Sequence, residues 1–260
     1  MSTHIHFKYS DHPTSNELLV LIHGLFGSLD NLSFIHRHFE KSCNVLAVDL
    51  PNHGKSAHVS GFTLNCCVEA LLPVVKNHVN GPVYVIGHSL GGKVAMLMAL
   101  NNPAMVQKLV VADIAPVVYP SLHNTIISAL LDVNLDNLNN RNDADSQLSS
   151  AIPESGIRQF LLKGLWQTAE GKWQWRFNLR DLAENYENIR GWPDTEKSFS
   201  HPSLFVKGGN SEYIKKEMQP AIVSRFPNAR AHIIENAGHW LHAEKPVAFN
   251  NVVERFLFSQ

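Results

Sequence analysis

The sequence has 260 residues, 44% of them hydrophobic, and a formal net charge of −1, which indicates one large domain or one domain with a sizeable insertion. This charge gives no electrostatic reason to bind nucleic acid or an anionic membrane, and no N-terminal signal pattern or run of 18 apolar residues predicts secretion or a membrane span. The three cysteines, Cys43, Cys66 and Cys67, form no disulfide framework, so we expect a reducing, cytoplasmic environment; the oligomeric state stays open.

Apolar patterns predict the strands of the first half of the chain. Residues 4–9 alternate apolar and polar side chains, as in a half-exposed antiparallel edge strand. Continuous apolar runs, typical of parallel strands that are buried on both faces, follow at 17–22, 44–50, 83–86 and 108–112. Helices are predicted at 31–39, at 63–80 and from Ser89 to Asn102. Strands that alternate with helices in this way predict a mostly parallel α/β sheet.

From Tyr119 to Phe199 helical spacing largely replaces the strand pattern. Three apolar faces of helical period lie within 122–133, 157–165 and 179–189, and residues 171–177 alternate as in a small hairpin. Strand patterns return at 203–207 and 231–234, and an amphipathic helix closes the chain at 246–258. We therefore predict a core made of residues 1–118 and 200–260, with a helical cap, residues 119–199, inserted after the strand that ends at Asp113.

The insertion carries four of the five tryptophans of the chain. We predict that the cap covers the pocket and that Trp166, Trp173 and Trp192 line an acyl-binding site there. The alternative is that these rings only pack the insertion onto the rest of the protein.

The strand at 83–86 leads into Gly87-His88-Ser89-Leu90-Gly91, which matches the Gly-x-Ser-x-Gly nucleophile elbow. The chain must reverse between the strand and the following helix, so Ser89 is forced into a strained conformation that exposes its hydroxyl group. Gly87 and Gly91 lack the Cβ atoms that would collide in so tight a turn. Ser89 is therefore the predicted nucleophile.

A second glycine-bearing loop, His23-Gly24-Leu25-Phe26-Gly27-Ser28, directly follows the strand at 17–22. Such a loop can present a backbone N–H group to an anion, and the residue after the nucleophile supplies another. We predict an oxyanion hole formed by the N–H groups of Leu25 and Leu90, with Phe26 as the less favoured alternative to Leu25. The other interpretation is that His23-Gly24 is only a tight turn.

A serine nucleophile needs a base and an acid that orients the base. His239 lies in a Gly-His loop straight after the last strand and is the predicted base. The usual acid position, in the turn Gly208-Gly209-Asn210-Ser211, holds no carboxylate. Asp113 ends the strand after the elbow strand, and we predict that it is the acid in preference to Glu212; Asp49 is expected to organise its own loop.

Fifteen histidines raise the question of a metal site. The pairs His4/His6 and His36/His38 have no carboxylate or third histidine at ligand spacing, so we predict no metal and interpret them as surface residues. Phe26, His88 and Trp240 are neighbours of the predicted reacting groups in the sequence, and we expect them to contact the substrate.

These residues lie in longer motifs by which the chain resembles the α/β-hydrolase superfamily and, within it, a group of bacterial esterases. The motifs are His23–Asn31, Asn52–Gly54, Gly87–Ser89, Asp113–Pro116, Trp175–Asn178, Gly208–Ser211 and Gly238–Trp240. The resemblance implies an α/β-hydrolase fold with a mostly parallel eight-stranded sheet, helices on both faces and a helical cap. It implies an esterase for short- to medium-chain acyl esters, with acyl-CoA thioesters as a further class, and no cofactor. It also implies an acid after the strand that follows the elbow, in agreement with Asp113.

Two other functions fit parts of this pattern. A carbon–carbon bond hydrolase shares the serine, histidine and acid, and only substrate tests separate it from an esterase. A non-catalytic binding protein of the same fold is disfavoured, because such proteins usually lack members of the triad and this chain has all three candidates.

Overall fold

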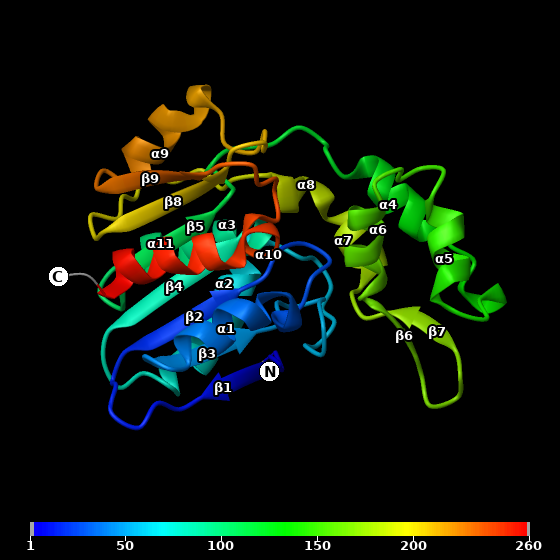
Figure 1. Cartoon of the computed structure of the whole chain (residues 1–260), viewed down its shortest axis with the longest axis horizontal. Coiled ribbons are helices and arrows are strands. Elements are labelled where there is room, and N and C mark those ends of the chain that lie inside the picture. The colour runs from blue at the N-terminus through cyan, green and yellow to red at the C-terminus, as the bar shows by residue number, and fades with distance from the viewer. Residues whose placement is uncertain (1–2, 259–260) are drawn as a thin grey trace.

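The computed structural model describes residues 3–258, which form a layered α/β core and a helical cap (Figure 1). In the core sheet the strand order is β1-β3-β2-β4-β5-β8-β9, and only β1 runs antiparallel to its neighbour. These strands are β1 (Phe7–Ser10), β2 (Leu18–Ile22), β3 (Asn44–Val48), β4 (Val83–His88), β5 (Val106–Ala112), β8 (Ser203–Gly208) and β9 (Ala229–Ile234).

The α/β-hydrolase fold is confirmed, but the expected count of eight strands is wrong, because the core sheet has seven strands within residues 3–258. Only one short strand precedes the first parallel strand: β1 pairs with β3 from Phe7 opposite Val48 to Ser10 opposite Val45. The segment 11–17 that joins β1 to β2 is polar, contains Pro13 and forms no strand. No second antiparallel strand therefore lies at this edge.

Helices cover both faces of the sheet because the buried strands are apolar on both sides. Leu19 and Leu21 of β2 pack into one core cluster, whereas Val20 and Ile22 pack into the other. The first cluster includes residues of α1 and α11, and the second includes residues of α2, α3 and α9. These helices are α1 (Ser33–Phe39), α2 (Leu64–Lys76), α3 (Leu90–Asn101), α9 (Gln219–Arg225) and α11 (Pro246–Phe258), with the short α10 (Leu241–Glu244) before α11. The described part of the chain also contains the 3-10 turns η1 (Leu29–Leu32), η2 (Leu135–Asn137) and η3 (Lys216–Met218).

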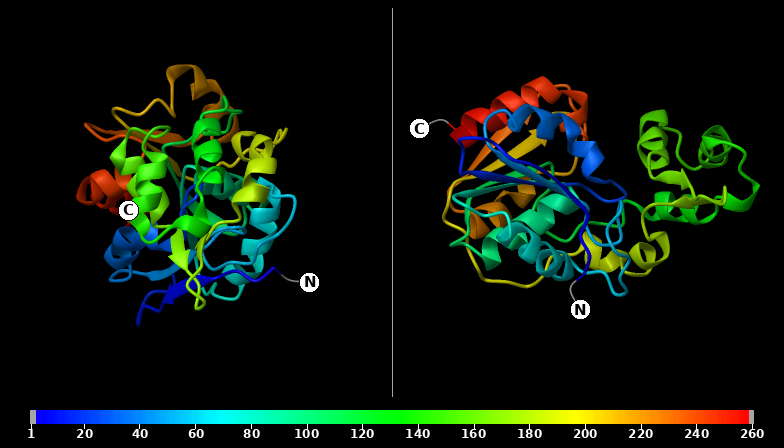
Figure 2. Two further views of the ribbon diagram at one scale, coloured as in Figure 1. Left: turned by 90° about the vertical axis from the view of Figure 1, so that its right-hand side faces the viewer. Right: turned by 90° about the horizontal axis from the view of Figure 1, so that it is seen from below.

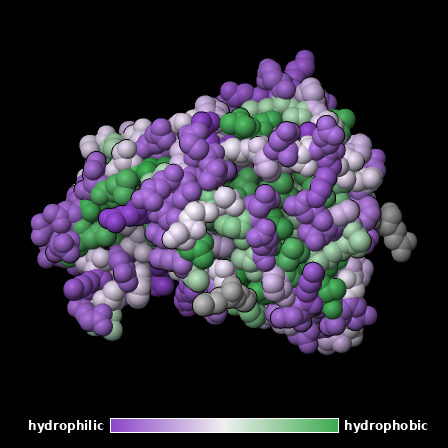
Figure 3. Space-filling view, turned by 180° about the vertical axis from the view of Figure 1, so that it is seen from behind, coloured by the Kyte–Doolittle hydropathy of each residue, from purple (hydrophilic) through white to green (hydrophobic). Residues whose placement is uncertain are grey.

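The cap lies beside the end of the sheet at which the parallel strands finish (Figures 1 and 2). Its elements are α4 (Asn124–Leu131), α5 (Arg141–Leu148), α6 (Ser155–Leu162), the hairpin β6 (Leu165–Gln167) and β7 (Trp173–Trp175), α7 (Leu179–Glu184) and α8 (Tyr186–Arg190). All of them fall between β5 and β8 in the chain. On the face seen in Figure 3, opposite to that of Figure 1, hydrophobic residues appear in separate patches among hydrophilic ones.

Polar contacts tie the cap to the core. The buried Lys93 of α3 donates hydrogen bonds from Nζ to the carbonyl oxygens of Arg190 (2.7 Å) and Gly191 (2.6 Å) at the end of α8. Burial, and then the charge of Arg190, lower the pKa of Lys93 to about 7. The buried Asp181 of α7 accepts from the side chain of Asn52 (2.7 Å). The cap is thus joined to the core by hydrogen bonds as well as by apolar packing.

None of the helices in the described part of the chain has the length and apolar character needed to span a bilayer. Five histidines are buried and a sixth, His123, is partly buried, and loss of contact with water is the first cause that lowers the pKa of each. The pKa of His53 falls to about 3 and that of His23 to about 4. The others in this group are His36, His88, His123 and His242. The burial of His36 corrects the interpretation of this residue as a surface histidine: it lies on the inner side of α1 and its Nε2 is hydrogen-bonded to Ser10 Oγ (2.7 Å). In the native protein these side chains are neutral at pH 7.

We predict that the free energy of unfolding falls as the pH drops from about 6.5 toward 4. In that window the unfolded chain takes up protons on these histidines near pH 6.5, whereas the native state does not, so each contributes a slope of up to about 1.4 kcal/mol per pH unit. Urea unfolding at a series of pH values measures the slope. His53→Gln should make it shallower, and His58→Gln, at an exposed position, should not. Equal slopes for His53→Gln and the wild type would contradict the assignment.

Candidate active site

Ser89 lies in the turn between β4 and α3, with φ of 54° and ψ of −119°, a conformation that L-residues rarely adopt. A Cβ atom on Gly87 would collide with the backbone of Gly91, and one on Gly91 would collide with the carbonyl oxygens of Ile22 and His23. The two glycines of the motif are therefore required by close backbone contacts on both sides of Ser89. The turn leaves the serine side chain at the wall of a cavity.

Three side chains from three strand ends meet beside this turn. His239, in the loop after β9, has Nε2 at 3.0 Å from Ser89 Oγ. Its Nδ1 lies 2.7 Å from Oδ2 of Asp113, the residue that directly follows β5 and is fully buried. The chain separates Ser89 from His239 by 150 residues, yet the parallel sheet brings both loops to one edge. This geometry allows a proton to pass from the serine to the imidazole while the carboxylate holds Nδ1–H.

The carboxylate of Asp113 has further donors. The N–H group of Gly208 donates to Oδ1 (3.1 Å), and the hydroxyl group of Ser211 donates to Oδ2. Ser211 stands where the sequence lacks the usual acid, so the turn after β8 supplies a hydroxyl group to the carboxylate that ends β5. Glu212 instead points outward, with a side chain 85% exposed that pairs with Lys215 at 3.3 Å. The structure brings Asp113, and not Glu212, to His239.

The loop after β2 passes directly against Ser89. A Cβ atom on Gly24 would lie 3.2 Å from the Cβ atom of Ser89, and a turn is closed by the N–H group of Gly27, which donates to the carbonyl of Gly24 (3.1 Å). Leu25 in this turn and Leu90 at the start of α3 line a small recess together with Ser89. Within residues 3–258, neither the N–H of Leu25 nor that of Leu90 donates to another protein group. Both are therefore available to an oxyanion.

His23 fixes this loop. Its Nδ1–H donates to the carbonyl of Gly24 (2.8 Å), and its Nε2 accepts the N–H of Leu50 (3.0 Å). Both nitrogens are used, and the neutral imidazole that these bonds require agrees with the lowered pKa of His23. His23 therefore acts on the site through the backbone of the loop.

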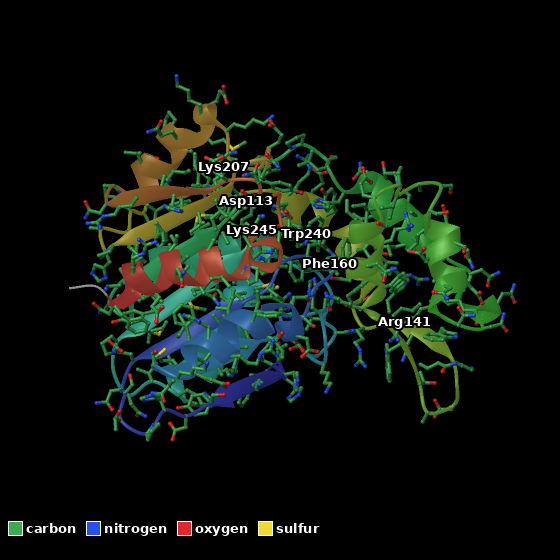
Figure 4. All side chains as sticks on the ribbon, viewed as in Figure 1. Asp113, Arg141, Phe160, Lys207, Trp240 and Lys245 are labelled. Atoms are coloured by element: carbon green, nitrogen blue, oxygen red, sulfur yellow. The ribbon has the colours of Figure 1, made fainter. Side chains whose placement is uncertain are left out.

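A cavity of about 710 Å³ lies between the core and the cap, with Ser89 and His239 in its wall. Figure 4 shows Trp240, from the core, and Phe160, from α6, at the junction of the two parts, where their ring centroids are 5.5 Å apart. The apolar side chains of the lining are Leu25, Phe26, Leu32, Leu122, Ile126, Ile157, Phe160, Leu161, Trp240 and Ala243. The size and the largely apolar wall fit a small-molecule ligand.

Of the residues expected to contact the substrate, Phe26, His88 and Trp240 line this cavity. Trp166, Trp173 and Trp192 do not, which corrects the expectation for the cap tryptophans. Trp166 lies on the hairpin β6–β7, which extends away from the core (Figure 1), and the guanidinium of Arg176 covers its ring at 4.8 Å.

Trp173 and Trp192 pack against the main apolar cluster of the protein, so the alternative interpretation describes them better. In their place α4 and α6 supply Ile126, Ile157 and Phe160 to the cavity. The helical spacing identified these as an apolar face, but the same spacing serves a packing face and a cavity wall alike. Sequence reasoning also missed Tyr213, which lines the cavity beside His239 and carried no motif signal.

The sequence and the fold were also compared with those of known proteins. The model of the alpha/beta hydrolase family matches residues 19–252. Esterase YbfF of Escherichia coli (strain K12) is 36% identical over 258 residues, which cover 99% of both chains. The sn-1-specific diacylglycerol lipase ABHD11 of Mus musculus is 38% identical over 247 residues, which cover 92% of this chain and 80% of the mouse protein. The solved structure of a marine microorganism esterase is similar with a TM-score of 0.94 and 33% identity, covering 98% of this chain and 100% of that one.

We predict that Gly91→Ala destabilises the protein by at least about 1–3 kcal/mol, because the new methyl group collides with backbone that cannot move away. Gly156→Ala in α6 is the control, since no atom lies within 4 Å of the Cβ position there, and it should be neutral or slightly stabilising. Urea unfolding of the two variants measures the difference. Similar stability of both variants would show that the elbow tolerates a side chain at Gly91.

Proposed function

The chain belongs to the alpha/beta hydrolase family, and we propose that it is a serine carboxylesterase that cleaves short- to medium-chain acyl esters. The observation that carries the proposal is the continuous chain of contacts from Ser89 Oγ through the imidazole of His239 to the buried carboxylate of Asp113. The esterase and lipase names of its relatives support ester hydrolysis as the reaction.

In this mechanism Ser89 Oγ attacks the ester carbonyl carbon while Nε2 of His239 takes the serine proton. The N–H groups of Leu25 and Leu90 hold the negative oxygen of the tetrahedral intermediate. When the intermediate collapses, the bond to the alcohol oxygen breaks and His239 gives its proton to the leaving alcohol. Water, activated by the same imidazole, then attacks the acyl-enzyme and releases the acid. The carboxylate of Asp113 stays ionised throughout and stabilises the imidazolium.

The cavity supports the proposed substrate class. Its apolar wall, supplied by both the core and the cap, suits a hydrocarbon acyl chain, and its volume suits a chain of limited length. Acyl-CoA thioesters are the second class within the proposal, because the same attack releases a thiol from a thioester carbonyl. A panel of alcohol esters and CoA thioesters with matched acyl groups decides between the two.

We predict that Ser89→Ala abolishes labelling by a fluorophosphonate and lowers kcat to the residual rate that binding and the oxyanion hole provide.

Asp113→Asn should lower kcat by about 10⁴-fold with little change in KM, because an amide can donate to His239 and so favours the wrong tautomer. Glu212→Gln is the matched control and should have far less effect, since its side chain is exposed. A near-silent Asp113→Asn beside a crippled Glu212→Gln would refute the assignment of the acid.

The acyl preference should depend on α6 and not on the hairpin tryptophans. Ile157→Trp places a larger side chain in the cavity wall, so kcat/KM for octanoyl esters should fall at least about 10-fold relative to acetyl esters. Trp166→Ala, outside the cavity, should leave the octanoyl-to-acetyl ratio at its wild-type value. An unchanged ratio in Ile157→Trp, or an equal change in Trp166→Ala, would show that the acyl chain binds elsewhere.

A further inference from the structure

The ring of Tyr213 stacks on the imidazole of His239. The two ring centroids are 3.6 Å apart and the planes differ by 15°. Tyr213 lies in the loop between β8 and η3 and is half-buried, with its ring in the cavity wall. No other aromatic ring in the described part of the chain lies so close to His239 or so nearly parallel to it: His88 is at 4.8 Å and 44°, and Trp240 is at 5.7 Å and 67°.

The other contacts of His239 reach its backbone and the edge of its ring, where Nε2 lies 3.0 Å from Ser89 Oγ. His88 donates from Nε2 to the carbonyl oxygen of His239 (2.9 Å), which fixes the backbone. Asp113 accepts from Nδ1, which fixes one axis through the ring. None of these contacts lies parallel to a face of the ring. The flat face of Tyr213 supplies such a contact.

Tyr213 is itself held at three points. Its N–H group donates to Ser211 Oγ (3.2 Å), and its carbonyl oxygen accepts the hydroxyl group of Tyr119 (2.6 Å). Its own hydroxyl group is hydrogen-bonded to Nε2 of His123 (3.2 Å), the residue that precedes α4 of the cap. Nδ1 of His123 is in turn hydrogen-bonded to the hydroxyl group of Tyr186 in α8 (2.8 Å). The stacking ring is thus fixed by the core at its backbone and by the cap at its tip.

We propose that Tyr213 is a positioning residue for His239, whose ring fixes the plane of the imidazole and stabilises the imidazolium by a cation–π contact. The inference rests on the proposed esterase function. A cation over the face of a phenol ring is attracted by its quadrupole, so the contact strengthens as His239 takes the serine proton. The interaction is therefore larger in the transition state than in the ground state, and its loss should lower kcat more than it raises KM.

The titratable and charged groups that face His239 come from several elements. They are Asp113 after β5, Ser89 and His88 at the end of β4, His242 in α10, His123 before α4, and Tyr213 itself. Burial lowers the pKa of His123 to about 4 and that of His242 to about 3, so both are neutral in the working range. Tyr213 can therefore stabilise the imidazolium without a competing positive charge from either histidine.

The test compares Tyr213→Leu, which removes the ring but keeps apolar bulk, with Tyr213→Phe, which keeps the ring and removes the hydroxyl group. For Tyr213→Leu we expect kcat to fall about 10- to 100-fold with KM within about twofold. The acidic limb of kcat/KM, which reports protonation of the base in the free enzyme, should move to lower pH by about 0.5, because the protonated form loses its cation–π partner. Tyr213→Phe should return the limb to the wild-type position and restore most of kcat.

Phe160→Leu is the matched control, since it alters another aromatic ring of the cavity wall that does not stack on His239; it should leave the limb in place. A Tyr213→Leu variant that raises only KM, or that leaves the limb unmoved, makes Tyr213 a simple wall residue and overturns the inference. Thermal unfolding checks that each variant folds, and Tyr213→Met replaces Tyr213→Leu if the latter does not.

The failure of this inference differs from the failure of the proposed function. If the wild type hydrolyses no ester, the esterase proposal is wrong. The ring-proton NMR titration of His239, which needs no activity, then still compares the wild type with Tyr213→Leu and Tyr213→Phe. A midpoint that is the same in all three proteins excludes the stacking effect, whereas a lower midpoint in Tyr213→Leu alone supports it.

Discussion

The site depends on the backbone strain at the ends of β4 and β5 and on the sheet that holds it. Ser89 and Asp113 both have positive φ, at 54° and 55°, which costs about 1–3 kcal/mol for a residue other than glycine. Each nevertheless continues the hydrogen bonding of the sheet, because the N–H of Ser89 donates to Ala112 (3.0 Å) and that of Asp113 donates to Val206 (2.9 Å). The sheet therefore holds the backbone of both residues in place.

A buried carboxylate needs donors, and its position in the sheet explains how Asp113 obtains them. β5 lies between β4 and β8, so the end of β5 has the nucleophile turn on one side and the turn after β8 on the other. The carboxylate accepts from Nδ1 of His239, which reaches Ser89 on the first side, and the second side gives the N–H of Gly208 and the hydroxyl of Ser211. Charge-assisted bonds of this kind compensate for the loss of water around a buried anion. With the acid at the end of β5, the turn after β8 supplies hydrogen-bond donors to the carboxylate in place of a carboxylate of its own.

Local patterns were sufficient for the fold and for the residues near Ser89, because each rests on short-range constraints. Apolar runs identify strands buried on both faces, and the glycines around Ser89 are required by contacts within a few residues. The cavity wall could not be predicted in the same way. Trp173 and Phe160 are both apolar aromatic residues of the cap, and only the packing of α6 against Trp240, and of Trp173 against the core, separates their roles. Tyr213 could not be identified either, because it belongs to no motif and only the folded loops after β8 and β9 bring it against His239.

Besides forming part of the cavity wall, the cap is therefore linked by hydrogen bonds to the ring that stacks on His239. His123 and Tyr186 reach His239 through the hydroxyl group and ring of Tyr213, while Lys93 of α3, the helix that begins at the nucleophile turn, holds the end of α8. The first route uses hydrogen bonds between side chains, and the second uses hydrogen bonds from Lys93 Nζ to the backbone carbonyl oxygens of Arg190 and Gly191. A displacement of α4 or α8 would move the stacking ring, so the cap that supplies part of the cavity wall is also connected to the imidazole of His239.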